Sequence, residues 1–523
     1  MNIAIGSLAL SLSAALLGCV VLLWSYKIIN WVWLKPKRLE IRLRQLGFRG
    51  NSYRILQGDM KDKKRMILEA KSKPIQLSDD IITRVHPDFH RLIQTYGKST
   101  IRWLGPMPEV YVMDPELIKD VLNRINDFHK PQRNPSSLLV VEGLATYEGK
   151  KWAKHRKLIN PAFHFEKLKS MIPKFYHSGN EMVSNWEKLA LASADGSCEI
   201  DVWQDLQNMT RDAISRTSFG SSFEEGKRIF ELLRELTKLV TQADLSVYIP
   251  GWRFMPTKIN RRRKALDKEI NASLRVIIKK KEEAIKEGNA ATGDLLDLLL
   301  ESSLNAMKEH NNKKDAGMSL NDVIEECKLF YFVGQETTEV LLVWTMVLLG
   351  QHQEWQKRAR DEVLRVFGTE KPNQSEVNNL KIVNMILHEV LRFYPPATMI
   401  NRATHKETVL GNMTLPAGVL VTIPVIAIHR DPQLWGEDAN EFKPERFSEG
   451  VSNATKGQLA FIPFSSGPRI CIGLNFTLME AKIAMALILQ RFSFELSPSY
   501  THAPYSLITL SPQHGAHMIL HKL

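Results

Sequence analysis

The spacing of hydrophobic residues predicts a chain built mainly from α-helices. Apolar side chains recur every three or four positions, as on the buried face of a helix, in seven long segments: 115–125, 167–189, 201–219, 226–243, 258–287, 320–349 and 353–367. Runs with the composition of β-strands are fewer and shorter; they lie at 99–103, 110–113, 419–423 and 518–521. The expected fold class is therefore mainly α with a small β component.

The N-terminal segment has the length and composition of a membrane anchor. Residues 3–25 are uncharged and mostly apolar, and about 20 such residues cross a bilayer as a helix. Basic residues follow this run and none precedes it, so the positive-inside rule places the N-terminus outside the cytosol and the rest of the chain inside it. A cleaved signal peptide is the alternative, but it would begin with basic residues and end at a small-residue cleavage site. We predict an anchor over residues 1–30 and a folded body over 31–523.

Length and cysteine content limit the class of protein further. The chain has 523 residues, and 44% of them are hydrophobic. This length exceeds the roughly 250–300 residues that a single hydrophobic core usually serves. No repeat or Gly/Ser linker divides it, which leaves either two closely packed domains or one unusually large one. Its four cysteines lie far apart, so they do not resemble a disulfide framework and indicate a reducing compartment.

The chain is basic, with a formal net charge of +13. Nucleic acid is one partner that such a charge suggests, but the sequence has no arginine-rich arm, zinc finger or RNA-binding signature. We therefore expect no nucleic acid, and assign the surplus charge to an anionic membrane surface or to an acidic protein partner.

A loop near the C-terminus places one cysteine where a thiolate could bind a metal. Gly467 and Gly473 permit a tight turn whose N–H groups can point at the sulfur of Cys471. A thiolate held in this way can ligate haem iron, while Arg469 can reach a haem propionate and Phe464 can cover the ring edge. A single buried cysteine is more often a small core residue. The full spacing F-x-x-G-x-R-x-C-x-G, however, resembles the cysteine-ligand loop of the cytochrome P-450 family.

This resemblance implies a cofactor, an activity and a location. The cofactor would be haem b with Cys471 as the axial thiolate ligand of its iron. The activity would be that of a monooxygenase that takes O2 and receives electrons from NADPH through a separate NADPH–cytochrome reductase. The fold would be the cytochrome P-450 fold over residues 31–523, preceded by one N-terminal transmembrane helix. The protein would sit in the endoplasmic reticulum membrane, in contact with lipid, as a single-pass protein with a cytosolic catalytic domain.

An acid and an alcohol interrupt the apolar helix near residue 335. The ordinary fate of such a threonine is a hydrogen bond to the preceding turn, with Glu336 facing a polar groove. The functional alternative is a proton relay through Thr337 and Glu336, because cleavage of O2 consumes two protons. Gly334 could let the helix open there. The segment resembles the A/G-G-x-D/E-T-T signature of monooxygenating members, except that Val333 stands where Ala or Gly is usual and could narrow the oxygen groove.

Glu389 and Arg392 form an E-x-x-R pair on a predicted helix. Charges at i and i+3 can pair, and an isolated pair of this kind is usually a surface bridge worth about 0–1 kcal/mol. The family resemblance implies instead a buried triad with Arg446, which follows some fifty residues later. Its role would be structural and not catalytic.

Trp152 and Arg156 are four positions apart, so their N–H groups face the same side of a predicted helix. Two such donors suit haem carboxylates, and the resemblance implies that role for both and for Arg402. The pair alone would indicate an ordinary amphipathic helix. Lysines 150, 151, 154 and 157 surround Trp152; they form either a docking face for an acidic electron donor or a solvated run of charge.

Five further segments, 33–38, 147–156, 160–164, 326–331 and 519–523, resemble the plant seventy-two clan of cytochromes P-450, subfamily A. That resemblance implies a hydrophobic terpenoid substrate and oxidation of one of its C–H bonds, in specialised metabolism. A triterpenoid is our first expectation, because residues 397–400 are mostly apolar. An iridoid monoterpenoid of the secologanin-pathway type, which segments 248–252 and 502–504 resemble, or a gibberellin is the alternative. An acidic iridoid would need a polar anchor, for which Arg133 and Asn134 are the candidates.

Two other classes of haem protein compete with the monooxygenase. Haem-thiolate isomerases and dehydratases use no reductase and typically lack the Glu-Thr pair, whereas Glu336 and Thr337 are both present. A non-enzymatic haem carrier or sensor would not need an acid–alcohol pair, an anchor and a basic face together. Consumption of NADPH with a reconstituted reductase separates the three classes.

Overall fold

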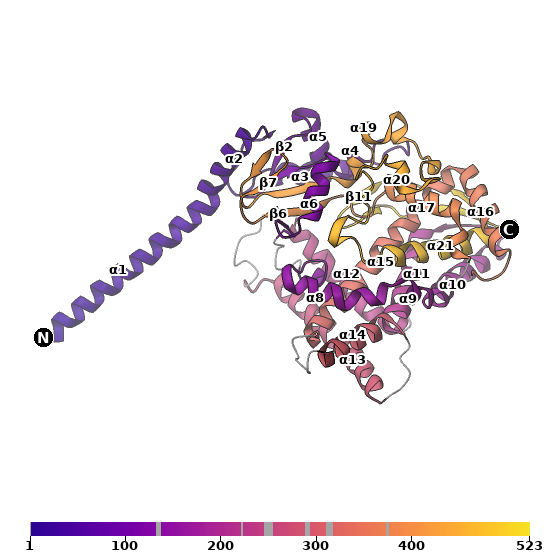
Figure 1. The fold of residues 1–523 in the computed structure, drawn as a ribbon, viewed down its shortest axis with the longest axis horizontal. Helices are drawn as coiled ribbons and strands as arrows, with labels where there is room; N and C mark the ends of the chain where they lie inside the picture. Colours follow the sequence, from indigo (N-terminus) through magenta and orange to yellow (C-terminus); the bar gives the residue numbers. More distant parts are fainter. Residues whose placement is uncertain are drawn as a thin grey trace.

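Helices make up most of the fold, which confirms the expectation from hydrophobic spacing (Figure 1). The computed structural model describes residues 2–131, 138–220, 223–244, 255–287, 293–309, 317–372 and 376–523. The longer helices are α1 (Asn2–Ile29), α2 (Lys35–Gln45), α3 (Met60–Lys71), α5 (Pro87–Tyr96), α6 (Pro115–Asn123), α8 (Gly149–Ile159), α10 (Ile172–Leu191), α11 (Val202–Phe219), α12 (Phe223–Asp244), α13 (Lys258–Lys286), α14 (Leu295–Glu309), α15 (Leu320–Gln351), α16 (Gln353–Phe367), α17 (Lys381–Phe393) and α21 (Leu474–Arg491).

Capping residues and prolines explain where the helices begin and end. The helix α11 starts after Asp201, whose side chain accepts a hydrogen bond from the N–H of Trp203. The segment predicted as one helix over 167–189 is two, α9 (Phe165–Lys169) and α10, because Pro173 suits only the first turn of a helix. The helix α17 ends at Phe393, just before Tyr394 and two prolines.

The β-structure is small and lies beside the helices. One sheet has six strands in the order β1-β2-β3-β9-β6-β4 and another has three in the order β10-β13-β5. The strands of the first are β1 (Arg49–Gly50), β2 (Thr100–Leu104), β3 (Met107–Tyr111), β4 (Phe128–His129), β6 (Ile400–Thr404) and β9 (Leu420–Ile423), and those of the second are β5 (Ser197–Asp201), β10 (Phe492–Leu496) and β13 (His517–Lys522). All four predicted strands are present, shifted by one to three residues at their ends. The hairpin β11 (Pro504–Ser506) and β12 (Leu510–Pro512) is one of two further two-stranded sheets, the other being β7 (Thr408–Leu410) with β8 (Met413–Leu415).

The helix α1 projects away from the rest of the molecule (Figure 1). From Leu12 onward its side chains are exposed, and Leu16, Leu17 and Leu22 each keep about two thirds of their surface accessible. The chain continues through residues 30–34 into α2, which carries the basic residues Arg42 and Arg44. An exposed helix of this length, uncharged as far as Lys27 in its last turn, fits a membrane anchor. Among the helices that the structure describes, α15 is also long and apolar enough to span a membrane, but most of its side chains are buried in the core.

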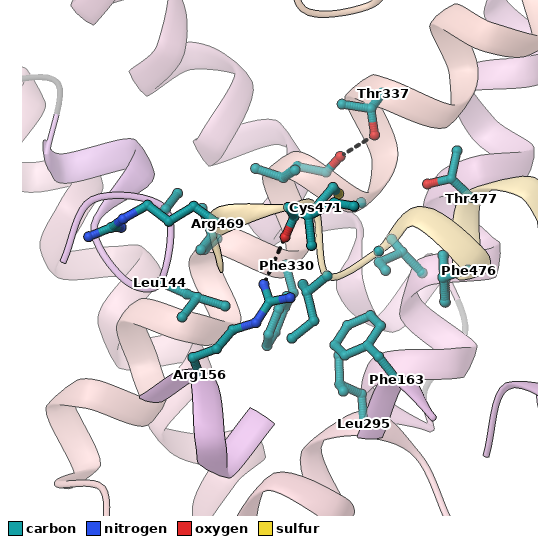
Figure 2. Close-up of a pocket in the computed structure, with 18 of the residues that line it drawn as sticks. Leu144, Arg156, Phe163, Leu295, Phe330, Thr337, Arg469, Cys471, Phe476 and Thr477 are labelled. Atoms are coloured by element: carbon teal, nitrogen blue, oxygen red, sulfur yellow. Dashed lines mark hydrogen bonds between the residues drawn. The ribbon is translucent and has the colours of Figure 1, made fainter. Parts of the chain in front are cut away.

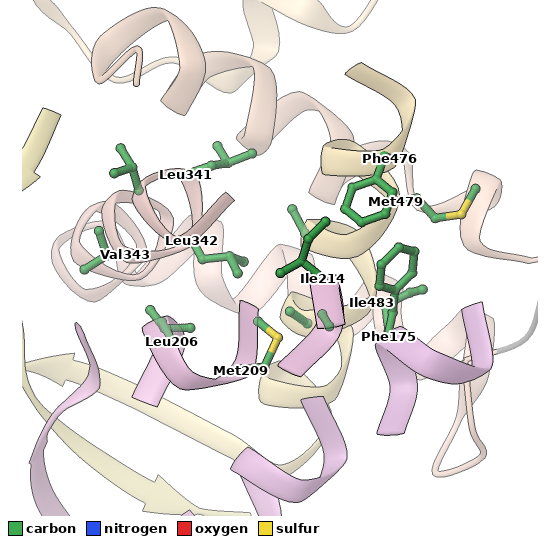
Figure 3. Packing of buried hydrophobic residues seen from close by; sticks show 14 of the residues in the cluster. Phe175, Leu206, Met209, Ile214, Leu341, Leu342, Val343, Phe476, Met479 and Ile483 are labelled. Carbon is green, nitrogen blue, oxygen red and sulfur yellow. The ribbon is translucent and has the colours of Figure 1, made fainter. Parts of the chain in front are cut away.

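The core forms around α15, which packs against α11, α17 and α21. Figure 3 shows Ile214 of α11, Leu342 of α15 and Phe476 of α21 among the side chains that meet there. Gly334 of α15 lies against Ile214, and a Cβ at that glycine would approach Ile214 to 2.6 Å. The sequence suggested that Gly334 could let the helix open. The helix instead runs unbroken through this point, so Gly334 permits close packing of two helices. This packing holds the helix of Thr337 near the loop of Cys471.

Candidate haem site

A cavity of about 230 Å³ brings together residues from distant parts of the chain (Figure 2). Six of the predicted site residues line it: Trp152, Arg156, Thr337, Arg469, Cys471 and Gly473. Most of the remaining lining is apolar and comes from Leu144, Ala145, Phe163, Ile214, Leu295, Leu329, Phe330, Val333, Ile470, Ile472 and Phe476. Such a lining excludes water and accepts a flat, largely hydrocarbon group.

The cysteine loop is held in shape by its backbone and by two glycines. The N–H of Cys471 donates to the carbonyl oxygen of Phe464 over 2.9 Å, which closes the loop. Gly467 has φ +72°, and a Cβ there would come within 2.6 Å of Asn123 at the end of α6, so this position requires glycine. Phe464 and Gly467 are not among the residues that line the cavity, but they hold the loop in shape, while Cys471 faces the cavity.

The surroundings of Cys471 favour the neutral thiol over the charged thiolate unless a cation binds the sulfur. Burial raises the pKa of the Cys471 thiol, although the N–H of Gly473 and the positive charge of Arg156 act in the opposite direction. The accessible surface of the cysteine is the surface that faces the cavity. A cation at the sulfur would deprotonate it outright, so the loop suits a metal ligand better than a free thiolate.

Arg402 gives the clearest sign that an anionic group belongs here. Its side chain on β6 is fully buried and does not itself line the cavity, and among the described residues its Nε and Nη2 atoms have no hydrogen-bond partner. Burial lowers the pKa of Arg402 to about 10, and the neighbouring charge of Arg469 adds to this effect. An unpaired buried guanidinium is costly. A carboxylate such as a haem propionate would satisfy it, so these residues fit haem b.

The other basic groups at this end of the cavity already have partners within the chain. Arg156 donates to the carbonyl oxygen of Ile470 over 3.0 Å. Arg469 donates to the carbonyl oxygen of Tyr147 over 2.9 Å, forms an ion pair with Glu148 and lies 4.5 Å from the ring centre of Trp152. Sequence reasoning did not find Glu148, because a glutamate just before a helix has no distinctive pattern.

Glu336 and Thr337 are adjacent but line different cavities. Thr337 lines the cavity of Cys471, and its hydroxyl donates to the carbonyl oxygen of Val333 over 2.9 Å, the ordinary back-bond of a helical threonine. Glu336 lines a second, polar cavity, where it accepts a hydrogen bond of 2.9 Å from the hydroxyl of Thr509. Val333 lines the first cavity, so its β-branched side chain does border the groove next to Thr337.

The predicted triad of Glu389, Arg392 and Arg446 is brought together away from this cavity. Arg392 pairs with Glu389 through two hydrogen bonds of 2.7 Å, both side chains are fully buried, and Arg446 lies 3.5 Å from the same carboxylate. Glu389 also accepts the N–H of Lys443. Arg392 further donates to the backbone carbonyl oxygens of His429, Ala439 and Glu441. The pair is therefore not a solvated surface bridge.

The lysines of α8 are only partly available for docking. Lys151 pairs with Asp322 at 2.9 Å and Lys154 donates to the carbonyl oxygen of Gly317, so both tie α8 to the start of α15. Lys150 and Lys157 are exposed. Arg133 and Asn134, the candidate anchors for an acidic substrate, lie outside the described residues.

A buried histidine–glutamate pair was not anticipated from the sequence. Nδ1 of His155 on α8 lies 2.7 Å from Glu326 on α15, and both side chains are fully buried. The other oxygen of Glu326 accepts the N–H of Leu144, which lines the cavity. This contact fixes α8, with Trp152 and Arg156, relative to α15.

Comparison with known proteins agrees with this arrangement. The family model for cytochrome P-450 matches residues 76–515. The chain is 56% identical to cytochrome P-450 72A397 of Kalopanax septemlobus, over 96% of each chain. It is 52% identical to 7-deoxyloganic acid hydroxylase of Catharanthus roseus, over 96% of this chain and 97% of that one, and 49% identical to secologanin synthase 1 of the same plant, over 98% and 97%.

Proposed function

Because the chain belongs to the cytochrome P-450 family and is a monooxygenase of its seventy-two A group, we propose that it inserts one oxygen atom from O2 into a C–H bond of a plant terpenoid. The family implies haem b with a cysteine thiolate ligand, a redox partner that supplies electrons, and a hydrophobic substrate. The observation that carries the assignment of the site is a single cavity lined by Cys471, by Arg156 and Arg469, and by Thr337.

Each of these residues has a distinct role in the proposal. Haem, when bound, supplies the iron at which O2 is activated. Cys471 holds the iron, and Arg402, with Trp152, Arg156 and Arg469, binds the haem carboxylates. The apolar lining places a hydrocarbon and keeps water out.

In this proposal Glu336 and Thr337 supply protons across α15, with Glu336 on the side of the polar cavity and Thr337 on the side of Cys471. Thr337 presents a hydroxyl to the cavity of Cys471, while the carboxyl of Glu336 lies in the second, polar cavity. In this proposal protons enter on the polar side at Glu336 and reach Thr337 by a movement of the Glu336 side chain or through water, because no hydrogen bond joins the two side chains in the described structure. Burial raises the pKa of Glu336, which lets it hold a proton nearer to neutral pH.

Substitution of Thr337 by alanine is expected to uncouple oxygen consumption from product formation. Haem and substrate binding should persist, because the threonine hydroxyl bonds only its own helix in this structure. Product formed per NADPH should fall about tenfold, less than the roughly 10²–10⁴-fold that a positioned proton-transfer group contributes to rate, with peroxide released in its place. An unchanged ratio would remove Thr337 from the relay.

Val333→Ala is the companion variant; a change in product regiochemistry would show that Val333 crowds the groove.

We propose a triterpenoid as the substrate ahead of an acidic iridoid. The lining includes the apolar Leu144, Leu329 and Phe330, and two of its described cations, Arg156 and Arg469, are assigned here to the haem carboxylates. An acid bound without a cation would be costly. The specific observation that favours the iridoid alternative is the 52% identity to 7-deoxyloganic acid hydroxylase.

A substrate panel tests this ranking. Microsomes that contain the protein and a plant reductase are incubated with NADPH and with triterpenoids, iridoid acids and gibberellins, and the products are read by mass spectrometry. We expect a haem spectral shift and an oxidised product with a triterpenoid. A strong shift and turnover with an iridoid acid, together with none from any triterpenoid, would reverse the ranking.

We further propose that the protein resides in the endoplasmic reticulum membrane with its catalytic body, residues 31–523, in the cytosol. The exposed apolar helix α1 and the basic residues of α2 support this orientation. The exposed lysines of α8 lie on the helix that carries Trp152 and Arg156, which favours this basic surface as the place where a NADPH–cytochrome reductase would dock.

A further inference from the structure

The second cavity, of about 270 Å³, contains a carboxyl group that the relay described above does not use. It is bounded by α11, α12, α15 and the hairpin β11–β12. Two acids on α15, Glu336 and Glu339, line it. The other charged or titratable groups that line it are Arg211 of α11, Arg234 and Lys238 of α12, Tyr331 of α15 and Tyr505 of β11.

Glu339 is buried and bonded only to neutral groups. Its side chain is 2% exposed, and its two oxygens accept hydrogen bonds from the amide of Gln207, over 3.2 Å, and from the amide of Gln335, over 2.8 Å. Within the described part of the chain, no lysine or arginine lies within ion-pair distance of Glu339 or of Glu336. Arg211 is the buried cation whose charge acts most strongly on the two carboxyl groups. It donates to Asn208 and Gln207 and not to either carboxyl group, and its Nε has no hydrogen-bond partner among the described residues.

The two carboxyl groups are close enough to affect each other. Residues three apart on a helix are surface neighbours, with Cβ atoms about 5–6 Å apart. Two carboxylates at that spacing in a poorly solvated place cannot both be ionised at low cost, so the pair tends to retain one proton. Burial, and then the charge of Glu336, raise the pKa of Glu339 to about 8.

We propose that Glu336 and Glu339 share one proton at neutral pH, and that Glu339 is a positioning residue that keeps Glu336 supplied with it. No hydrogen bond joins the two carboxyl groups in the described structure, so the transfer passes through water of the polar cavity: an O–H bond of Glu339 breaks as the water takes the proton, and an O–H bond of Glu336 forms as the water gives one up. The pair regains a proton from water in the polar cavity, which is large enough to admit it. No electron moves in this step. The inference rests on the proposed function only where it assigns the proton to the relay of Thr337.

The shared proton is tested by infrared spectroscopy of the full-length protein as a function of pH. A buried, protonated carboxyl group gives a C=O stretching band that should disappear as the pH rises through about 8. Glu339→Gln should remove this band. Glu336→Gln should shift its loss to lower pH, because the charge that raises the pKa of Glu339 is gone. A band unaffected by either substitution would overturn the shared proton.

Coupling of NADPH consumption to product tests the role of that proton. In the natural protein the product formed per NADPH should fall as the pH rises through about 8, where Glu339 loses its proton. Glu339→Gln removes the carboxyl group that supplies the second proton site of the pair, so coupling at neutral pH should be about tenfold lower and should lose its fall near pH 8. Glu339→Asp keeps a titratable carboxyl group and should restore part of the pH dependence.

A matched control is Glu325→Gln on the same helix, because Glu325 already pairs with Lys328 at 2.7 Å. Burial raises the pKa of Glu325 as well, so any band that this variant removes belongs to Glu325, whereas the band assigned to Glu339 and the coupling should be unchanged. If Glu339→Gln removes the band but has the coupling profile of the natural protein, the residue has no role in proton supply. If no variant oxidises any substrate while the band behaves as expected, the proposed function fails and the shared proton stands.

Discussion

Replacement of Cys471 by serine is expected to abolish product formation entirely. A serine hydroxyl is not ionised at neutral pH, so it cannot replace the thiolate, and the loop has no second sulfur: the other cysteines are Cys19, Cys198 and Cys327. The measurement is the absorption spectrum of the reduced protein with carbon monoxide, whose red-shifted band reports a thiolate ligand. That band should be lost together with the activity.

Cys198→Ser is the control for this experiment. Cys198 is half-buried on β5 and does not line the cavity, so the variant should keep both the band and turnover. Survival of the thiolate band in Cys471→Ser would show that another group ligates the iron. Loss of activity with the band intact would separate ligation from catalysis.

Replacement of Arg392 by methionine should strongly destabilise the folded protein. The change leaves the carboxylate of Glu389 buried and without its main partner, and it leaves three backbone carbonyl oxygens without their donor. Removal of one partner of a buried pair costs about 3–5 kcal/mol, a large share of the roughly 5–15 kcal/mol that usually holds a protein folded. Thermal unfolding and the yield of haem-loaded protein measure the effect.

Arg358→Met gives the comparison for a surface pair. Arg358 lies 3.0 Å from Glu445, with both side chains at least 40% exposed, and loss of such a bridge costs about 0–1 kcal/mol. Methionine keeps hydrophobic contact with Trp355, over whose ring Arg358 lies. Equal losses in the two variants would contradict a special structural role for Arg392.

The helices and the residues of the haem cavity were the parts most accessible from sequence. The segment of α16 was predicted residue for residue, because hydrophobic spacing and the following glycine mark it clearly. Cys471, Arg469 and Thr337 occur in dense motifs whose spacing carries chemical meaning, and the structure places all three on one cavity. Their roles remain predictions until the variants are measured.

What sequence could not supply were contacts between residues far apart in the chain. The pairing of Arg469 with Glu148 joins positions more than 300 residues apart, and the bond between His155 and Glu326 spans 171 residues. Both glutamates lie in segments noted only for their family resemblance, 147–156 and 326–331, and that resemblance names no partner for them, so only folding reveals it. The direction in which a helical side chain points was equally hidden: Glu336 and Thr337 are neighbours in sequence, yet only the three-dimensional packing shows that they enter separate cavities.

The position of α15 between the two cavities bears on how enzymes of this kind diversify. Because one helix acts as a partition, the apolar residues on one side and the acids on the other are separate sets. Substitution of Leu329 or Phe330 can reshape the chamber that receives the hydrocarbon without touching Glu336 or its surroundings. A lineage could therefore acquire new substrates through changes on one side of this wall while it keeps the acids proposed to deliver protons unchanged on the other.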